Sequence, residues 1–469
     1  MVHLHVRSWF SFLAGGSPPS ALVAEAARLE QPALALTDLH GIYGAVRFAD
    51  ACRQQGVRPI FGATVCLRRL PHEAPFPLVL LARSPRGFQR LNALLTGAHG
   101  ASYQHDYLLH LDASRPDKLP SPPDIPLLSW SALEEGTDDL ICLAGGLEGR
   151  LLWLLESGQG AEAEAWARDL ARVFPGRFYV ELTHWERRGD GLRVERLAHL
   201  AEALDLPLVA TNAVRYARPD DFPRYDALNC VRLGITVEDR HVERAQNDRA
   251  WLLSDRDLKL RMPYPQAFRS IDEIAEQCHV ALLADEVTPP SARLPPGQDP
   301  PRWLRHLCDQ GMQSRYPGQK RAAAERQLEY ELSVVNDLDL AEFFLVVHEV
   351  VAYARRQGIR CAGRGSAANS ILAYLLAITE VDPIEHKLLF ERFLHRGRKG
   401  MPDIDVDFDS ERRNEVILWM EQRFGSEHAA MTANVNTYRV RGAVREMMKV
   451  LGWDLEVVGN LTRFFTPWD

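Results

Sequence analysis

Short apolar runs alternate with amphipathic stretches along residues 1–275. Apolar runs bounded by turn-forming residues are typical of buried strands, and apolar positions three or four residues apart are typical of helices. We predict strands at 32–38, 76–82, 140–144, 178–182 and 206–211, and helices at 20–29, 160–173 and 191–204. The alternation favours an α/β architecture with a largely parallel sheet, and the number of units favours a barrel.

Two clusters of prolines interrupt these patterns. Residues 115–126 carry five prolines and are predicted to form a loop, whereas residues 289–301 carry six and are predicted to be a linker. Beyond the linker, helical patterns cover 302–336 and 341–357. We therefore divide the chain into three regions: 1–275, 276–434 and 435–469.

Composition is that of an ordinary globular protein, with 46% apolar and 25% charged residues among 469. The net charge of −8 excludes nucleic-acid binding by bulk charge, so any such contact requires a local basic patch. The sequence contains no apolar run of about 18 residues, the length that predicts a membrane helix, and its N-terminus lacks the pattern of a signal peptide. The seven cysteines are scattered, so we expect neither a disulfide framework nor a zinc site, and we expect a cytoplasmic protein.

The sharpest local pattern is the alternation of acidic and apolar residues at 401–408. Strict alternation predicts a strand with Asp403, Asp405 and Asp407 on one face. Carboxylates this close repel each other unless a cation lies among them, and Mg²⁺ binds one or two carboxylates together with substrate phosphates. Two such ions about 4 Å apart can stabilise both reacting oxygens in phosphoryl transfer. The alternative is a solvated edge strand that is acidic by chance.

A second pattern, Gly363-Arg364-Gly365-Ser366, precedes an apolar helical run at 367–378. Glycines let the backbone approach a ligand closely. A helix that begins at Ser366 would point free N–H groups at an anion, and Arg364 would add positive charge. The segment is either a phosphate cradle or a plain strand-to-helix turn. Placed before the acidic strand, it has the order expected of a nucleotidyltransferase.

Basic residues follow these motifs. Arg392 lies between apolar residues and is a candidate for a second triphosphate contact, although a surface ion pair with Glu391 or Glu385 is an alternative. Further on, basic residues at helical spacing predict a stripe suited to a nucleic-acid backbone, or simply a solvated helix face. The stripe comprises Arg439, Arg441, Arg445 and Lys449.

Four blocks of sequence occur in one order: 342–345, 363–370, 389–394 and 401–408. Together they resemble the bacterial family C DNA polymerases, the DNA polymerase III alpha subunit. Asn369 and the block at 430–438 are more similar to the error-prone branch of that family. The resemblance covers the whole chain. It implies a Pol β-like nucleotidyltransferase palm of α+β type, present in part, and the start of a helical thumb at 435–469.

The same resemblance implies roles for individual residues. Asp403 and Asp405 match the first two catalytic, metal-binding carboxylates of a site for two Mg²⁺ ions, whereas Asp407 matches a position that is not usually a primary ligand. Three further residues match positions that hold the incoming dNTP, beside Gly363 and Arg364 of the cradle. These three are Gly365, Ser366 and Arg392.

Residues 1–275 resemble the polymerase and histidinol phosphatase (PHP) domain, a distorted seven-stranded barrel that can hold up to three metal ions. His5 and Asp38 match two expected ligands. Other residues stand at most of the remaining ligand positions: Arg7, Trp9, Leu39, Thr64, Pro77, Gly146, Ala213 and Arg215. We therefore expect a degenerate site without metal, in which His3, His5 and His40 are structural or solvated. We also expect an ammonium-like or guanidinium group that pairs with Asp38 in place of a cation.

The function that the resemblance implies is template-directed DNA synthesis, in replication or in error-prone translesion synthesis. A primer 3′-hydroxyl would attack a dNTP on primer–template DNA, and the partners could include the sliding clamp or a second polypeptide. The family's third catalytic aspartate lies beyond the point where this sequence ends, so we expect residues 1–469 alone not to extend a primer. The alternatives are a non-catalytic scaffold, half of a split polymerase and, less favoured, a PHP-type 3′–5′ exonuclease or phosphoesterase.

Overall fold

The computed structural model describes residues 1–69, 73–103, 126–282, 291–398, 401–425, 428–432 and 434–465. The chain forms two compact units, which we describe separately. Unit 1 comprises Met1–Leu283 together with Val435–Asp469, and unit 2 comprises Ala284–Asn434. Most of the proline-rich loop predicted at 115–126, and the first two residues of the linker predicted at 289–301, lie outside the described residues.

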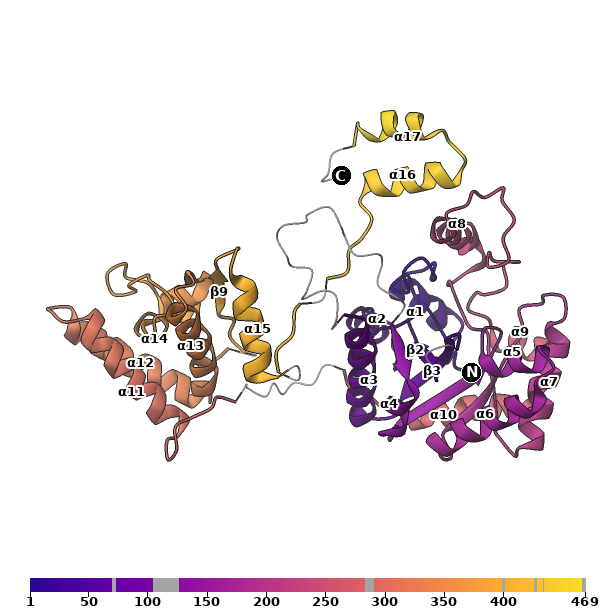
Figure 1. The fold of residues 1–469 in the computed structure, drawn as a ribbon, viewed down its shortest axis with the longest axis horizontal. Coiled ribbons are helices and arrows are strands. Elements are labelled where there is room, and N and C mark those ends of the chain that lie inside the picture. The colour runs from indigo at the N-terminus through magenta and orange to yellow at the C-terminus, as the bar shows by residue number, and fades with distance from the viewer. Residues whose placement is uncertain are drawn as a thin grey trace. The chain divides into compact units, whose positions relative to one another are not determined.

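Unit 1 is built on one seven-stranded sheet (Figure 1). Along its main path the strands follow the order β1-β2-β3-β5-β6-β7, and β4 pairs with β2. Their bounds are β1 Ala33–Leu36, β2 Arg58–Arg68, β3 Phe76–Ala82, β4 Leu127–Ser129, β5 Leu140–Gly145, β6 Phe178–Thr183 and β7 Leu208–Thr211. This sheet confirms the prediction of seven strands in an α/β domain.

The sheet is largely parallel, as predicted, except at its centre. β3 runs antiparallel to both β2 and β5, whereas the other pairs are parallel. The reason is the connection between β2 and β3, which is too short to hold a crossover helix and therefore returns the chain antiparallel.

The N-terminal segment brings the two ends of the sheet together. Val6 bridges to Val214 just after β7, and the Val6 carbonyl accepts a 2.8 Å hydrogen bond from the backbone N–H of Thr37 just after β1. The backbone N–H of Arg7 donates in turn to the Val214 carbonyl at 2.9 Å. The sheet is therefore curled into the distorted barrel that the sequence predicted, and residues 3–7 lie where its edges meet.

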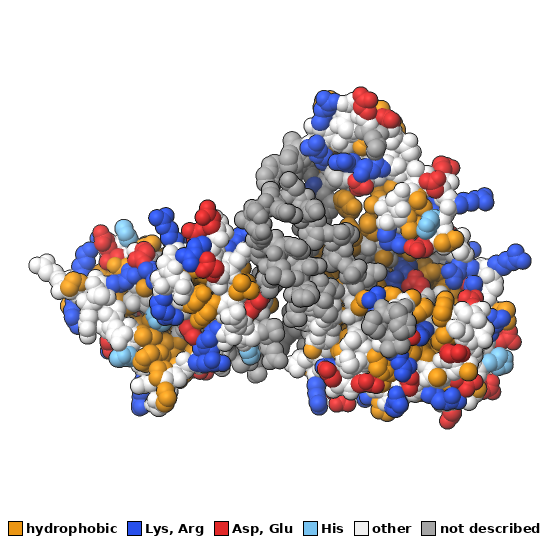
Figure 2. All heavy atoms as spheres, in the orientation of Figure 1, with side chains coloured by type: hydrophobic (Ala, Val, Ile, Leu, Met, Phe, Trp, Pro, Cys, Tyr) orange, Lys and Arg blue, Asp and Glu red, His pale blue; other side chains and the backbone are white. Residues whose placement is uncertain are grey.

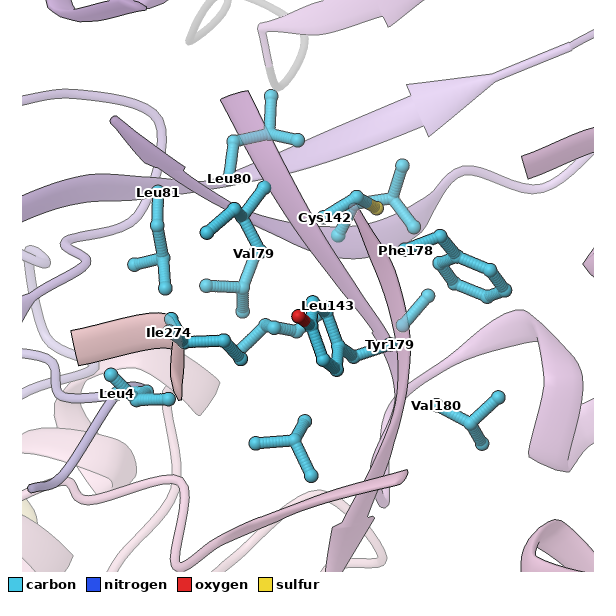
Figure 3. Close-up of a cluster of buried hydrophobic side chains, with 14 of the residues drawn as sticks. Leu4, Val79, Leu80, Leu81, Cys142, Leu143, Phe178, Tyr179, Val180 and Ile274 are labelled. Atoms are coloured by element: carbon cyan, nitrogen blue, oxygen red, sulfur yellow. The ribbon is translucent and has the colours of Figure 1, made fainter. Parts of the chain in front are cut away.

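Helices surround this sheet. Their bounds are α1 Pro19–Arg28, α2 Ala45–Gln55, α3 Pro85–Tyr103, α4 Trp130–Glu134, α5 Arg150–Glu156, α6 Gly160–Val173, α7 Asp190–Ala203, η1 Pro219–Asp221, α8 Phe222–Leu233, α9 Asp255–Arg261 and α10 Pro265–Gln277. Figure 3 shows the core between the strands and α10, where Val79, Leu143 and Tyr179 lie near Leu4 and Ile274. Burial of these apolar side chains stabilises the barrel.

Two further helices of unit 1 come from the end of the chain. α16 (Val440–Val450) lies against α8, and the N–H of Val237 donates to the carbonyl of Val450 at 2.9 Å. Tyr438, just before α16, stacks on Phe12 with ring centroids 6.2 Å apart. α17 (Leu455–Thr462) follows and packs on α16. The segment predicted to begin a thumb therefore packs within unit 1.

Unit 2 combines helices with a two-stranded antiparallel sheet. Its elements are α11 Pro300–Arg315, α12 Arg321–Asp337, α13 Ala341–Arg356, β8 Cys361–Arg364, η2 Gly365–Asn369, α14 Ile371–Leu375, η3 Phe390–Arg392, β9 Asp405–Phe408 and α15 Arg413–Phe424. The helical stretch predicted at 302–336 is two helices, because Pro317 and Gly318 separate α11 from α12. Phe344, Phe390 and Phe393 meet edge to face in the core. No helix in the described part of the chain is long and apolar enough to cross a membrane.

Candidate functional site

The two motifs around residues 364 and 405 are neighbours on one small sheet. β8 and β9 pair antiparallel, so that Arg364 lies opposite Asp405 and Gly363 lies opposite Val406. Backbone hydrogen bonds therefore hold the glycine motif and the acidic motif together, although about forty residues of sequence separate them.

The carboxylates of the acidic motif are not equivalent. Asp405 and Asp407 lie on β9, whereas Asp403 precedes the strand, which is shorter than the predicted strand at 401–408. Arg364 donates from Nε to Oδ1 of Asp407 at 3.0 Å. Within the described residues, no hydrogen bond or ion pair involves the carboxylates of Asp403 and Asp405. Arg364 thus compensates one charge of the motif, and two exposed or half-buried carboxylates remain available.

Each glycine of the cradle motif is required for a different reason. A side chain at Gly363 would lie 2.8 Å from the carbonyl oxygen of Ile378, which accepts the Gly363 N–H. Gly365 has φ +69°, in the left-handed region, and a side chain there would lie 3.3 Å from Oδ2 of Asp405. The second glycine therefore lets the backbone turn directly beside an acidic residue.

The turn after β8 differs from the predicted helix at 367–378. Residues 365–369 form the 3₁₀ turn η2, and α14 begins only at Ile371. The N–H groups of Ile371 and Leu372 donate to the carboxylate of Glu331 at 3.0 and 3.3 Å. The start of α14 is thus capped by the protein's own carboxylate, and only η2, with exposed Ser366, is open to a ligand.

Glu331 is a residue that the sequence did not single out. It lies on α12 with 0% of its surface exposed, and it accepts further hydrogen bonds from Ser370 and Gln327. Burial raises the pKa of its carboxyl to about 7, although these hydrogen bonds oppose the increase.

Arg392 ends η3, which lies next to η2, and its side chain is exposed. The predicted alternative, an ion pair with Glu391 or Glu385, is not seen. Glu391 instead accepts a 2.9 Å hydrogen bond from Tyr330, and Glu385 pairs with Lys320 at 3.3 Å. Arg392 is therefore placed near the cradle turn without either of these partners.

The residues predicted to stand at the lost PHP ligand positions come together in unit 1. Many of them line one small cavity with His5: Pro77, Gly146, Ala213 and Arg215. His5 Nδ1 lies 2.8 Å from Oε1 of Glu181, which also accepts from Thr211. Burial lowers the pKa of His5, and the contacts of Glu181 with His5 and Thr211 lower the pKa of its carboxyl even though burial raises it. The lowered pKa of His5 and the lowered pKa of Glu181 both fit a neutral imidazole that donates a hydrogen bond to an ionised carboxylate.

Two guanidinium groups occupy the same region. Arg7 donates to Oε2 of Glu148 at 3.1 Å, and Arg215 donates to Oε1 of the same carboxylate at 3.2 Å. Attraction to Arg215 and Arg7 lowers the pKa of the Glu148 carboxyl well below its usual range. The expected pairing with Asp38 is wrong, because serine side chains and a backbone N–H already hold that carboxylate. Its donors are Ser8 N, Ser8 Oγ and Ser11 Oγ.

These residues do not fit a metal cluster. Within the described residues, no three His, Cys, Asp or Glu side chains converge to hold an ion. A cation would also meet the charges of Arg7 and Arg215, which are 5% and 2% exposed. Glu148 and Glu181 were not expected from the sequence, since each depends on partners that are distant along the chain, such as Arg7 and His5.

The basic stripe lies on α16 and just before it. Arg439, Arg441 and Arg445 are exposed, and Lys449 is half-buried and pairs with Glu446 at 2.8 Å. Figure 2 shows Lys and Arg side chains on the surface of the α16–α17 segment. The stripe therefore exists as a helix face, with three exposed arginines and one lysine already paired.

Comparison with known protein families gives two matches. Residues 3–184 match the PHP domain, and residues 302–469 match the bacterial DNA polymerase III alpha NTPase domain. The chain is thus similar to the PHP domain in its first part and to the DNA polymerase III alpha subunit in its last part.

Two of the relatives with similar sequences are error-prone DNA polymerases. The error-prone DNA polymerase of Symbiobacterium thermophilum is 42% identical over 100% of this chain and 42% of its own length. That of Methylococcus capsulatus is 38% identical over 98% of this chain and 40% of its own length. The chain thus spans about two fifths of the curated relatives it matches. A solved structure of a candidate metal-dependent phosphoesterase from Bifidobacterium adolescentis covers 45% of this chain and 86% of its own, with 14% identity and a TM-score of 0.31.

Proposed function

We propose that the chain is part of a template-directed DNA polymerase and that unit 2 carries nucleotidyl transfer. In this reaction a primer 3′-hydroxyl attacks the α-phosphate of a dNTP, and pyrophosphate leaves. The observation that carries the proposal is the β8–β9 pairing, which sets Gly365 directly beside Asp405. The reaction requires the triphosphate and its metal ions to be held at one place. The adjacency of Gly365 and Asp405 supports the assignment of both roles to this sheet.

Asp403 and Asp405 would hold the metal ions. Oxygen donors without other partners suit Mg²⁺, and both carboxylates meet that condition within the described residues. Bound Mg²⁺ would stabilise the charge that develops on the attacking and leaving oxygens. Asp407 is not assigned this role, because Arg364 already compensates its charge.

The triphosphate would lie along the cradle turn. Gly365 allows the backbone to approach it, the exposed hydroxyl of Ser366 can donate to it, and Arg392 can neutralise it from the neighbouring η3. Gly363 and Arg364 would act indirectly, since they fix β8 to Ile378 and to Asp407. The exposed arginines of α16 would contact phosphates of primer–template DNA.

Unit 1 would serve this function as a scaffold. Arg7, Glu148 and Arg215 tie together loops from three separate parts of the barrel without a metal ion. Because the donor set does not fit a metal cluster, we do not assign metal-dependent nuclease or phosphoesterase activity to this unit.

The test is equilibrium binding of Mn²⁺ and of dATP with Mg²⁺ to the whole 469-residue chain. Replacement of both Asp403 and Asp405 by Asn should weaken Mn²⁺ binding by about tenfold or more, which corresponds to about 1.4 kcal/mol. The matched control is Asp407→Asn, on the same strand but paired with Arg364, which should bind Mn²⁺ as the wild type does. Equal Mn²⁺ affinity in the wild type and the double variant would show that these are only surface carboxylates.

A further inference from the structure

A second cavity in unit 1 lies over the degenerate site. It has a volume of about 420 Å³, and five arginines but only two glutamates, Glu148 and Glu243, are among the described residues that line it. The arginines are Arg7, Arg187, Arg215, Arg232 and Arg244. A concave site with this many guanidinium groups is suited to an anion.

The outer three arginines are each engaged by a separate carboxylate. Arg187 pairs with Asp190 at 3.3 Å, Arg232 with Glu243 at 3.1 Å and Arg244 with Asp226 at 2.7 Å. These pairs fix the rim of the cavity and compensate its charge. The three rim arginines therefore need no additional anion to compensate their charge.

The inner pair differs from the rim. Arg7 and Arg215 are 5% and 2% exposed, and they share the single carboxylate of Glu148. Within the described residues, Arg7 Nε and Arg215 Nη1 are buried and lack a hydrogen-bond partner. A buried guanidinium N–H without an acceptor is unfavourable, so the pair can gain a further acceptor at little cost in desolvation.

The other carboxylates nearby cannot fill this role. Glu181 is held by His5 and Thr211, and Asp38 is held by Ser8 and Ser11. Glu148 itself is half-exposed, with 49% of its side chain accessible, so it borders the cavity without filling it. Among the described residues, no further carboxylate is left to accept from the two unpartnered donors.

We propose that this cavity binds a phosphate-type anion between Arg7 and Arg215, where the family resemblance expects metal ions. A tetrahedral oxyanion has enough acceptor oxygens to take hydrogen bonds from both guanidinium groups. No bond is made or broken, so the site is a receptor and not a hydrolase. Free inorganic phosphate and the terminal phosphate of a DNA strand present this same chemistry. The proposal is independent of nucleotidyl transfer by unit 2.

The test is calorimetric titration of the whole chain with inorganic phosphate, in a chelator-containing buffer of low ionic strength. We expect saturable binding by the wild type and about tenfold weaker binding by Arg215→Gln, which corresponds to about 1.4 kcal/mol. The control is Arg188→Gln, an exposed arginine nearby that does not line the cavity, which should bind as the wild type does. Absence of saturable binding by the wild type, or equal affinity in Arg215→Gln, would overturn the proposal.

A second variant keeps the test informative if Arg215→Gln does not fold. Glu148→Gln removes the carboxylate that competes for both guanidinium groups, so phosphate should bind more tightly and raise Tm more than it does for the wild type. If Glu148 only forms a structural ion pair, phosphate will not raise the Tm of this variant beyond that of the wild type, and the proposal fails.

The source of the anion is distinguished by competition. A 5′-phosphorylated oligonucleotide is compared with the same oligonucleotide without that phosphate. Displacement of inorganic phosphate by the phosphorylated form alone supports the site with a DNA end as its ligand. Displacement by neither form supports the site with the free anion as its ligand.

Discussion

The hydroxyl of Ser370 donates a 2.7 Å hydrogen bond to Oε2 of Glu331, which lies 39 residues earlier on α12. Ser370 is the residue between the cradle turn η2 and α14, and its own Oγ accepts from the N–H of Ala373. One buried carboxylate therefore fixes the end of the turn and the start of the helix together. The position of the proposed triphosphate turn therefore depends on a residue of α12, 39 positions earlier in the sequence.

The raised pKa of Glu331 predicts a pH dependence for unit 2. Because its carboxyl has a pKa of about 7 when folded and about 4.5 when unfolded, the folded state binds more protons between these values. The stability of unit 2 should therefore fall as the pH rises from about 4.5 through 7. Relative to Glu331→Gln, which cannot ionise, the wild type should lose about 3 kcal/mol over this range. Hydrogen exchange of α12 and α14 amides, corrected for intrinsic rates, measures the difference.

The matched control for this prediction is Glu329→Gln. Glu329 lies on the same helix, but it is exposed and pairs with Arg305. Its replacement should leave the wild-type pH dependence in place. If both variants showed the same dependence, the carboxyl of Glu331 would not be the titrating group.

The lowered pKa of His3 predicts that the stability of unit 1 depends on pH in the opposite sense. The pKa of His3 is lowered to about 4, chiefly by burial and also by the N-terminal amine, although the hydrogen bond to Leu253 and the charge of Asp255 raise it. The folded state therefore binds fewer protons than the unfolded state between pH 4 and 6.5, so stability is lost as the pH falls through that range. Relative to His3→Gln, the wild type should lose about 3 kcal/mol.

The free energy of unfolding of the wild type and of His3→Gln is measured by denaturant titration between pH 7 and pH 4. Unfolding is followed in peptides from β1 and α9. His199→Gln is the control, because its side chain is 71% exposed and its replacement should not alter the pH dependence. A wild type and His3→Gln that lose stability in parallel on acidification would contradict the assignment to His3.

Local sequence patterns correctly predicted the strands and helices that are determined by their own residues. β3 has the predicted bounds, β5 and β6 extend one residue further, and α6 matches its predicted range. β2 was not predicted, since Gly62 interrupts its apolar run. The structure explains this glycine, because a side chain there would lie 2.4 Å from the carbonyl oxygen of Leu80 on β3. Gly62 lowers the strand propensity of this segment, yet it is required for β2 to pair with β3.

The sequence predicted which residues form the candidate site, but it did not predict the contacts between them. The two motifs were recognised separately, and the pairing of Arg364 with Asp407 depends on a register that sequence alone does not fix. Glu331 and Glu148 carry no local signal, because each acts on partners from distant elements. The guanidinium pairing was expected, but its partner was taken to be Asp38 and is Glu148.

The donor set of unit 1 predicts that this unit holds no zinc, manganese or iron when the whole chain is purified. Tight sites for these metals need three or four converging imidazole, thiolate or carboxylate ligands. Here His5 is engaged by Glu181, and Arg7 and Arg215 repel a cation. Elemental analysis after gel filtration should give well under one of these ions per chain. Near-stoichiometric metal that is lost in His5→Ala would show that the ligand set is wrong.

The exposed arginines of α16 predict how strongly salt weakens DNA binding. Arg441 and Arg445 lie one helical turn apart and are both exposed, so both can contact phosphates of one strand. Each phosphate contact contributes about 0.9 to the slope of log K against log salt, so replacement of both by Gln should reduce the slope by about 1.8. Duplex binding by the whole chain, measured by fluorescence anisotropy at several salt concentrations, gives the slope. Lys449→Gln is the control and should change it less, because Lys449 already pairs with Glu446. An unchanged slope in the double variant would mean that the stripe is a solvated face, and DNA would have to be bound elsewhere on the chain.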